Sequence, residues 1–177
     1  EDRDGEKVTL RPEATASVAR AYILHGMLNQ PQPVKMWYEG PMFRHERPQA
    51  GRYRQFHQIG FEVIGATDSA VDAMLITIAY NILKQIGLET VVHVNSIGSP
   101  ESRETYVQKL VAHYKSFRGK LNEEHKKRLQ KNPLRILDLK DEELSEIRET
   151  APQMVDHLDD ESREHFMRML EFLDDLQ

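Results

Sequence analysis

The sequence predicts an α+β fold, in which an antiparallel sheet with flanking helices is followed by a helical, acidic region. Strand-like and amphipathic helical runs alternate over residues 8–117, whereas only helical patterns appear from residue 122 onward. The charge changes at the same place, because residues 1–121 carry 15 basic and 13 acidic side chains whereas residues 122–177 carry 9 and 16. The net charge of −5 over 177 residues therefore combines a slightly basic part with a strongly acidic one.

The elements of the first part follow from hydrophobic periodicity and from the places of glycine and proline. In chain order we expect a strand at 8–10, a helix at 14–28, strands at 34–38 and 55–64 around a loop at 47–54, a helix at 68–86, a strand at 91–94 and a helix at 101–117. Thr15 or Ser17 is the expected N-cap of the first helix, and Pro31 ends it because proline cannot continue a helix. The two strands around the loop are antiparallel if that loop is a hairpin.

The second part contains only helices, with breaks expected at Pro133 and Pro152 and a last helix that begins at Asp160. The chain has no cysteine, which excludes a disulfide framework, a thiolate zinc site and a catalytic thiol. No apolar run approaches the roughly 20 residues that cross a bilayer, so we expect a soluble, cytoplasmic protein with no membrane partner. Because the chain starts without methionine inside a turn-like segment, we also expect a piece of a longer protein.

The segment from Pro41 to Gln58 is the most basic part of the chain, with four arginines and a single acid, Glu46. Arginine forks match phosphate oxygens and stay charged at any working pH, so several on one loop suggest a polyphosphate ligand. Alternate residues of a strand share a face, and the expected groups are Arg44 with Glu46, and Arg52, Arg54 and Phe56 with Gln58. A phosphate clamp, a carboxylate and an aromatic face fit a nucleotide. A solvated surface or a general nucleic-acid contact fits the composition as well.

Two further polar sets lie outside this loop. Glu13 and Thr15 come where a strand gives way to a helix, and they either form a variant of a capping box or bind a cationic ligand group. Gln58 and Glu62 share one strand face, and Glu62 needs a donor if it is buried but not if it is exposed. The histidines lack metal-ligand spacing, so no metal site is expected. Neither a P-loop nor a dinucleotide fingerprint is present, so side chains would have to hold a nucleotide.

The run GPMFRHERPQAGRYRQFHQ, from Gly40 to Gln58, resembles motif 2 of the class II aminoacyl-tRNA synthetases, in the form characteristic of the histidyl-tRNA synthetases. The run TLRPEAT, from Thr9 to Thr15, is similar to the amino-acid-binding segment of that family. Residues 95–98, 132–135 and 161–166 resemble landmarks of its insertion region. The resemblance implies a partial class II catalytic core, including motif 2, at 1–98 and a helical insertion domain at 99–177.

The resemblance also implies a reaction and the residues that serve it. The family are ligases of protein biosynthesis that activate histidine with ATP and Mg²⁺ and transfer it to tRNA(His). Arg44 would be the catalytic residue, in contact with the α-phosphate and the histidine carboxylate. The ATP-binding residues would be Arg44, Glu46 at the adenine amine, Phe56 stacked on adenine, and Arg52 at the terminal phosphates. The histidine-binding residues would be Glu13, Ala14, Thr15, Arg44, Gln58 and Glu62. Ala14 stands where the family commonly has glycine, which narrows the backbone choices beside Glu13.

Several family segments have no counterpart in the chain, namely motif 1 of the dimer interface, a second histidine-recognition segment, a glycine-rich strand, motif 3 and the anticodon-binding domain. We therefore expect an internal fragment that is inactive alone, cut from a parent that is a homodimer. Within the acidic region, any tRNA contact is expected to use Lys126, Lys127 and Arg128.

Two other functions compete with this interpretation. The first is the synthetase-like regulatory subunit of ATP phosphoribosyltransferase, which shares the fold without aminoacylating. Retention of the full adenylation set, from Arg44 to Glu62, argues against it. The second is a nucleic-acid-binding module that uses the arginine loop. Its affinity would fall steeply with salt and would not respond to ATP.

Overall fold

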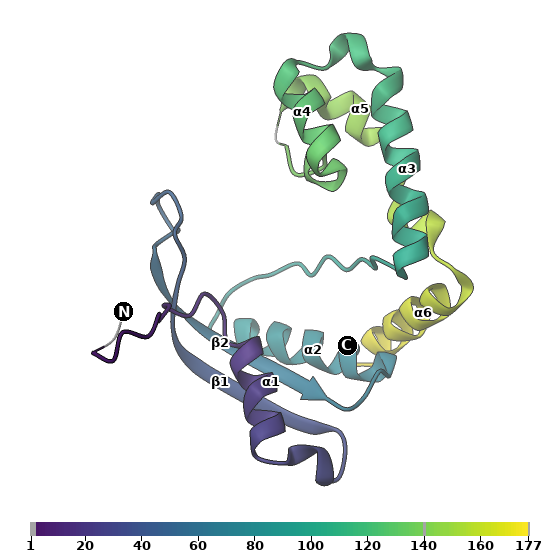
Figure 1. Cartoon of the computed structure of the whole chain (residues 1–177). Helices are drawn as coiled ribbons and strands as arrows, with labels where there is room; N and C mark the ends of the chain where they lie inside the picture. The colour runs from purple at the N-terminus through teal and green to yellow at the C-terminus, as the bar shows by residue number, and fades with distance from the viewer. Residues whose placement is uncertain (1–2, 140, 177) are drawn as a thin grey trace. The chain divides into compact units, whose positions relative to one another are not determined.

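The computed structural model describes residues 3–139 and 141–176, and the chain divides into two compact units, Glu1–Val71 and Asp72–Gln177 (Figure 1). The first unit holds the strands, and the second consists of helices joined by irregular segments. The α+β prediction is confirmed. In the part of the chain that the structure describes, no helix is both long and apolar enough to cross a bilayer.

The first unit is built on an antiparallel ribbon of two strands, β1 (Val34–Phe43) and β2 (Gln55–Ile64). The hairpin prediction is confirmed, and β1 extends five residues beyond the expected strand end at residue 38. The register sets Met36 opposite Glu62, Gly40 opposite Gln58 and Met42 opposite Phe56, so these residues share one face. We call this the Gln58 face. The opposite face leaves large apolar side chains open to solvent, including Trp37 and Ile59 at 67% and 58% exposure.

A helix, α1 (Thr15–Leu24), precedes the ribbon and is followed by the short helix η1 (Met27–Asn29). Its N-cap is Ala14, whose side chain makes no capping hydrogen bond, so the expectation that Thr15 or Ser17 caps the helix was wrong. The carboxylate of Glu13 instead accepts a hydrogen bond from the backbone N–H of Ala16 at 3.3 Å. That bond satisfies one of the free N–H groups at the helix start, as a capping residue does.

Two predicted strands do not form. Residues 8–10 are irregular and exposed. The next residue, Arg11, accepts a backbone hydrogen bond from Phe43 N–H of β1 at 2.8 Å. Residues 91–94 are likewise irregular, and Val91 is 82% exposed. Their composition favours strands, but a strand is stable only when a neighbour completes its backbone hydrogen bonds. Among the described residues, β1 and β2 pair only with each other.

The second unit follows the predicted helices closely. Its helices are α2 (Ser69–Gln85), which begins just before the unit boundary, α3 (Pro100–Ser116), α4 (Glu123–Lys131), α5 (Ser145–Glu149) and α6 (Asp160–Asp175), with the short helices η2 (Arg118–Lys120), η3 (Pro133–Ile136), η4 (Glu142–Leu144) and η5 (Met154–His157). Asp68 caps α2 by accepting from the N–H of Ala70 at 2.7 Å, and Gly87 follows the helix with φ +82°.

The hydrophobic core of this unit lies among α3, α4, α5 and the short helices between them. Leu110, Tyr114, Ile136, Leu144 and Ile147 are each less than 2% exposed, and Tyr106, Leu121, Leu129, Met154 and Leu158 complete the cluster. Burial raises the pKa of Tyr114 above its ordinary value. The helical region from residue 99 onward therefore has a core of its own.

The helices α3 and α6 are joined at their N-termini by a hydrogen-bonded cluster that we call the neck, made of Ser99, Ser102, Asp159 and Ser162. Ser99 Oγ accepts from Ser102 N–H, and Asp159 Oδ1 accepts from Ser162 N–H at 2.8 Å, so each helix has its own cap. Ser102 Oγ also donates to Asp159 Oδ2 at 2.6 Å and accepts from Asp159 N–H at 2.9 Å. These bonds, that from Ser102 above all, hold the pKa of Asp159 well below its usual range.

Candidate nucleotide and amino-acid site

Arg44 comes directly after β1 and is held in place by neutral groups. Its backbone N–H donates to the carbonyl of Arg54 at 2.8 Å, which closes the ribbon beyond the end of the strands. Its Nε donates to the carbonyl of Pro12 at 3.2 Å, and its Cζ lies 5.0 Å from the centre of the Phe56 ring. No carboxylate pairs with it among the described residues, so its charge is open to an anionic ligand.

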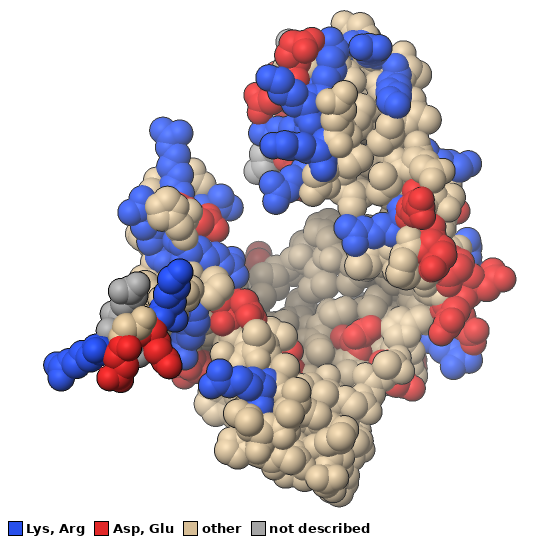
Figure 2. All heavy atoms as spheres, in the orientation of Figure 1, with Lys and Arg blue, Asp and Glu red and all other residues tan. Residues whose placement is uncertain are grey.

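Glu46 and Arg52 lie across the loop from each other and form an ion pair. Arg52 Nε is 3.0 Å from Glu46 Oε2, and Arg54 Nε donates to the carbonyl of Glu46 at 3.3 Å. The Arg52 side chain is 61% exposed, and an exposed pair of this kind contributes at most about 1 kcal/mol. Arg52 or Glu46 can therefore break this ion pair and bind a ligand group instead, at a small cost in free energy. Figure 2 shows Lys and Arg side chains gathered over this loop.

We expected the arginines to alternate between the two faces of strands, but the strands end before they reach the arginines. β1 ends at Phe43 and β2 begins at Gln55, so Arg44, Arg52 and Arg54 belong to the loop. The structure nevertheless brings Arg44 to Phe56, because backbone bonds continue past the strand ends. Phe56 itself is half-buried and lies on the Gln58 face, as the strand alternation predicted.

A second polar group lies where α1 begins. Thr15 Oγ1 donates to Glu62 Oε1 at 2.7 Å, and this bond joins the helix to the Gln58 face of β2. Glu62 is half-buried, so the prediction that it would need a donor is met by Thr15. Ala14 is buried at 6% exposure, and Glu13 holds the helix N-terminus. Two carboxylates thus lie near one helix start, an arrangement suited to a cationic group.

Gln58 lies on β2 between Phe56, which Arg44 contacts, and Glu62, which Thr15 contacts. Its Nε2 donates to the hydroxyl of Tyr38 at 3.2 Å, and its Oε1 is buried without a hydrogen-bond partner in the described residues. Buried polar atoms in native proteins are nearly always paired. The unpaired acceptor at this place is therefore available to a hydrogen-bond donor.

Sequence reasoning missed two residues of this site, Tyr38 and Arg11. Arg11 Nε donates to the carbonyl of Pro41 at 2.8 Å, and its guanidinium covers Gly40, where a Cβ atom would lie 2.6 Å from Nη2. Arg11 therefore fastens the segment that carries Glu13 to the end of β1. The glycines at positions 40 and 60, each facing a large side chain, were the available signal, but the pairing depends on a register that the sequence alone does not fix.

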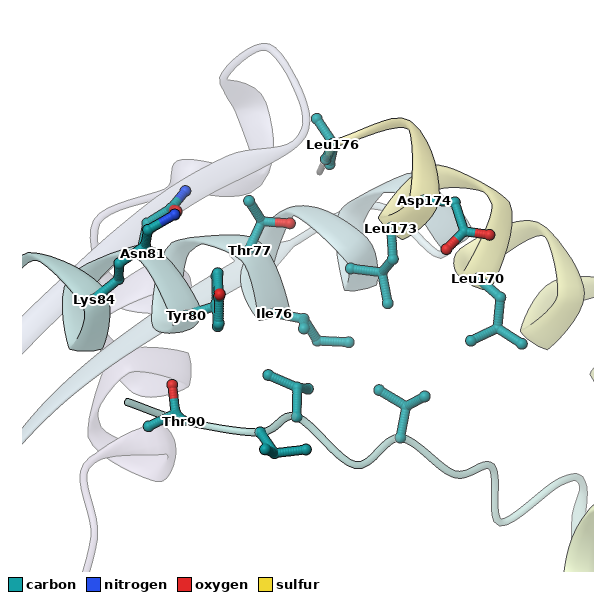
Figure 3. Close-up of a pocket in the computed structure, with 13 residues that line it drawn as sticks. Ile76, Thr77, Tyr80, Asn81, Lys84, Thr90, Leu170, Leu173, Asp174 and Leu176 are labelled. Atoms are coloured by element: carbon teal, nitrogen blue, oxygen red, sulfur yellow. The ribbon is translucent and has the colours of Figure 1, made fainter. Parts of the chain in front are cut away.

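A pocket of about 670 Å³ lies in the second unit between α2, α6 and the segment 90–94 (Figure 3). It is lined mainly by apolar side chains, and Thr77, Asn81, Lys84 and Asp174 add polar groups. None of the site residues predicted from the sequence lines it. Among the described residues, no group of three or more His, Asp or Glu side chains is placed to hold a metal ion.

Comparisons with known proteins identify the family of the chain. Residues 1–171 match the tRNA synthetase class II core domain (G, H, P, S and T). The chain is 51% identical to a histidine–tRNA ligase of Halothermothrix orenii over 98% of the chain and 42% of that protein, and 47% identical to one of Microcystis aeruginosa over 99% and 41%. The crystal structure of apo S. aureus histidyl-tRNA synthetase superposes with a TM-score of 0.67 at 37% identity, over 99% of the chain and 40% of that structure.

The matches also show how much of each relative the chain covers. The chain spans about two fifths of the length of the curated relatives it matches. The resemblance drawn from the runs at 9–15 and 40–58 is confirmed, since the match covers almost every residue. By its sequence, its ribbon and its match to a solved synthetase, the chain belongs to the class II tRNA synthetase core domain family.

Proposed function

We propose that the chain is the part of a histidine–tRNA ligase that binds ATP and histidine for formation of histidyl-adenylate. The full-length protein then transfers the histidyl group to tRNA(His). The observation that carries the proposal is Arg44, whose guanidinium lies on Phe56, donates to the carbonyl of Pro12 and has no carboxylate partner among the described residues. It lies at the end of a ribbon face that offers buried and acidic acceptors at Gln58 and Glu62.

Each residue has a role that its surroundings support. Arg44 binds the α-phosphate and the substrate carboxylate, and it stabilises the charge that develops as the carboxylate attacks. Phe56 offers its half-buried ring to the adenine base, and the exposed Arg52 exchanges Glu46 for the terminal phosphates. Glu46, released from Arg52, accepts from the adenine amine. Catalysis then rests on orientation and electrostatics, with no covalent nucleophile.

The amino-acid side of the site is complementary to an ammonium group. Glu13 and Glu62 supply negative charge, Thr15 fixes one oxygen of Glu62, and Gln58 supplies a neutral acceptor. Ala14 places its backbone beside Glu13 at the start of α1. These groups together bind the α-amino group of histidine, and Arg44 takes its carboxylate.

Further parts of the proposal rest on family membership. Mg²⁺ accompanies ATP and is held mainly by the phosphates, which is its usual mode in nucleotide sites and suits a chain whose described residues form no acidic cluster. Residues 1–98 form part of the catalytic core, and 99–177 form an insertion domain. The full-length protein is a homodimer, as the family implies. A cytoplasmic location is part of the same proposal, since tRNA is present in that compartment.

The tRNA contact of this chain is proposed on α4. A groove of about 410 Å³ there is lined by Lys127, Arg128, Lys131 and Arg135, with Glu124 and Asn132. Arg128 is paired with Glu124 at 2.7 Å, and Lys126 with Glu123, whereas Lys127, Lys131 and Arg135 have no carboxylate partner among the described residues. Unpaired cations around a groove suit a phosphate backbone. Charge reversal at Lys126, Lys127 and Arg128 should weaken tRNA binding by the full-length protein, and unchanged affinity contradicts this contact.

The regulatory-subunit alternative is not favoured. The relatives to which the chain is 44–51% identical are histidine–tRNA ligases, and the phosphate-facing Arg44 and the ammonium-facing acceptors are both retained. A regulator of another enzyme has no chemical need for both sets.

The deciding experiment is histidine-dependent exchange of pyrophosphate with ATP by the full-length protein. Arg44→Ala should lower exchange by a factor on the order of 10² to 10³, because one fixed donor to transition-state charge is lost. Arg20→Ala, which removes an exposed arginine of α1 that has no ion pair among the described residues, is the matched control and should leave exchange unchanged. Near wild-type exchange in Arg44→Ala would refute the assignment. The 177-residue chain alone should show exchange at background.

A further inference from the structure

Tyr38 occupies the middle of the Gln58 face. In the ribbon register it lies opposite Gly60, and Gln58 and Glu62 are the nearest residues of β2 on the same face, one on each side. A Cβ atom built on Gly60 would overlap the tyrosine ring. The ring therefore lies directly on the backbone of β2, and a residue larger than glycine at position 60 would displace it.

The position of the ring fixes the amide of Gln58. The Tyr38 hydroxyl oxygen accepts a hydrogen bond from Gln58 Nε2 at 3.2 Å. A side-chain amide carries its donor and its acceptor on one rigid plane, so fixing Nε2 also fixes Oε1. Oε1 is the atom that is buried and unpaired in the described residues. An amide without this restraint could turn its NH₂ group toward the same space, and an NH₂ group repels an ammonium ion.

We propose that Tyr38 is a positioning residue for the amino-acid substrate, which holds Gln58 so that Oε1 accepts a hydrogen bond from the substrate ammonium group. The inference rests on the proposed function, because it concerns the same histidine-binding face. Gly60 is the structural condition for it, since only glycine leaves space for the ring. The side-chain hydrogen bond of Tyr38 goes to Gln58, whereas Arg44 lies over Phe56, so we expect its effect on the amino acid and not on ATP.

The first test is Tyr38→Phe in the full-length protein, measured by pyrophosphate exchange. This change keeps the ring on Gly60 and removes the hydroxyl. The KM for histidine should rise about 3- to 10-fold, as the loss of one neutral hydrogen bond predicts. The KM for ATP and the melting temperature should stay at wild-type values. Tyr80→Phe, which removes a phenol hydroxyl from α2, is the matched control and should change neither KM.

The second test is a double-mutant cycle with Gln58→Ala. If Tyr38 acts through Gln58, then Tyr38→Phe has no further effect on the histidine KM once Gln58 is alanine. Effects that multiply independently overturn the inference, as does an unchanged histidine KM in Tyr38→Phe. An equal rise in the KM for ATP also overturns it, because it would show a general structural role. Absence of histidine-dependent exchange in the wild-type protein contradicts the proposed function itself.

Discussion

Replacing Thr15 by valine removes one hydroxyl group and keeps the branched shape of the side chain. The hydroxyl donates to Glu62 Oε1 at 2.7 Å, and a hydrogen bond to a charged group contributes about 1.5 to 3 kcal/mol. Because Thr15 is exposed, water replaces part of this bond, and we expect about 1 to 2 kcal/mol of substrate binding to be lost. At about 1.4 kcal/mol for each factor of ten, the KM for histidine should rise roughly 5- to 30-fold.

The assay is histidine-dependent pyrophosphate exchange by the full-length protein, with three variants compared. Thr15→Val should raise the histidine KM, and Thr15→Ser should restore it, since serine keeps the donor. Ser17→Ala removes a hydroxyl two residues further along α1 that makes no hydrogen bond among the described side chains, and it should have no effect. The reasoning is refuted if Thr15→Val leaves the KM unchanged, or if serine fails to restore it.

Two further predictions concern stability and are measured by urea unfolding of the chain. Leu110→Ala, at a core position with 0% exposure, should lower the free energy of unfolding of the second unit by about 2 to 5 kcal/mol, whereas Leu88→Ala, at 53% exposure, should change it by less than about 0.5 kcal/mol. Equal effects would contradict the core assignment. The neck should make the stability of the chain depend on pH, because its hydrogen bonds lower the pKa of Asp159 in the folded state. The contribution of the Asp159 carboxylate to stability is complete above its ordinary pKa of 3.8, and it is lost as the pH falls below 3.8. Asp159→Asn should therefore be less stable than wild type near neutral pH, and the difference should shrink in acid; a constant difference would contradict the role of the charge.

Where local pattern and tertiary structure agree, the sequence predicted the fold well. The ribbon was predictable because β-branched and aromatic runs flank a loop with Pro48 and Gly51, and β2 begins and ends at the predicted residues. The helix after Asp68 was predictable because its apolar spacing, its cap and its terminal glycine all indicate the same limits.

The two strand predictions failed for one physical cause, which is that a strand depends on a partner. Residues 8–10 and 91–94 have the composition of strands, but pairing is a tertiary property that composition does not contain. The cap prediction for α1 failed for a different and local reason. The carboxylate of Glu13 reached the free N–H of Ala16, so neither Thr15 nor Ser17 was needed there.

The candidate site could be predicted in its residue types and less so in its geometry. Arg44 and the aromatic ring of Phe56 were singled out by residue type for a nucleotide, and the structure brings Arg44 onto Phe56. The contact between Glu46 and Arg52 was not foreseen, because it depends on how the loop turns back. Tyr38 was missed because its neighbours, Gln58 and Gly60, are defined only once the register is known.

The neck has a consequence for how this protein family can change. Ser102 and Asp159 are 57 residues apart in sequence and yet form two hydrogen bonds with each other. The two ends of the segment between them therefore lie side by side. A segment whose two ends meet can be shortened, lengthened or replaced without pulling on what precedes or follows it. The segment between Ser102 and Asp159 is therefore a natural unit of exchange. Chimeras that join at these two residues should preserve both helix caps while the intervening helices are swapped between relatives.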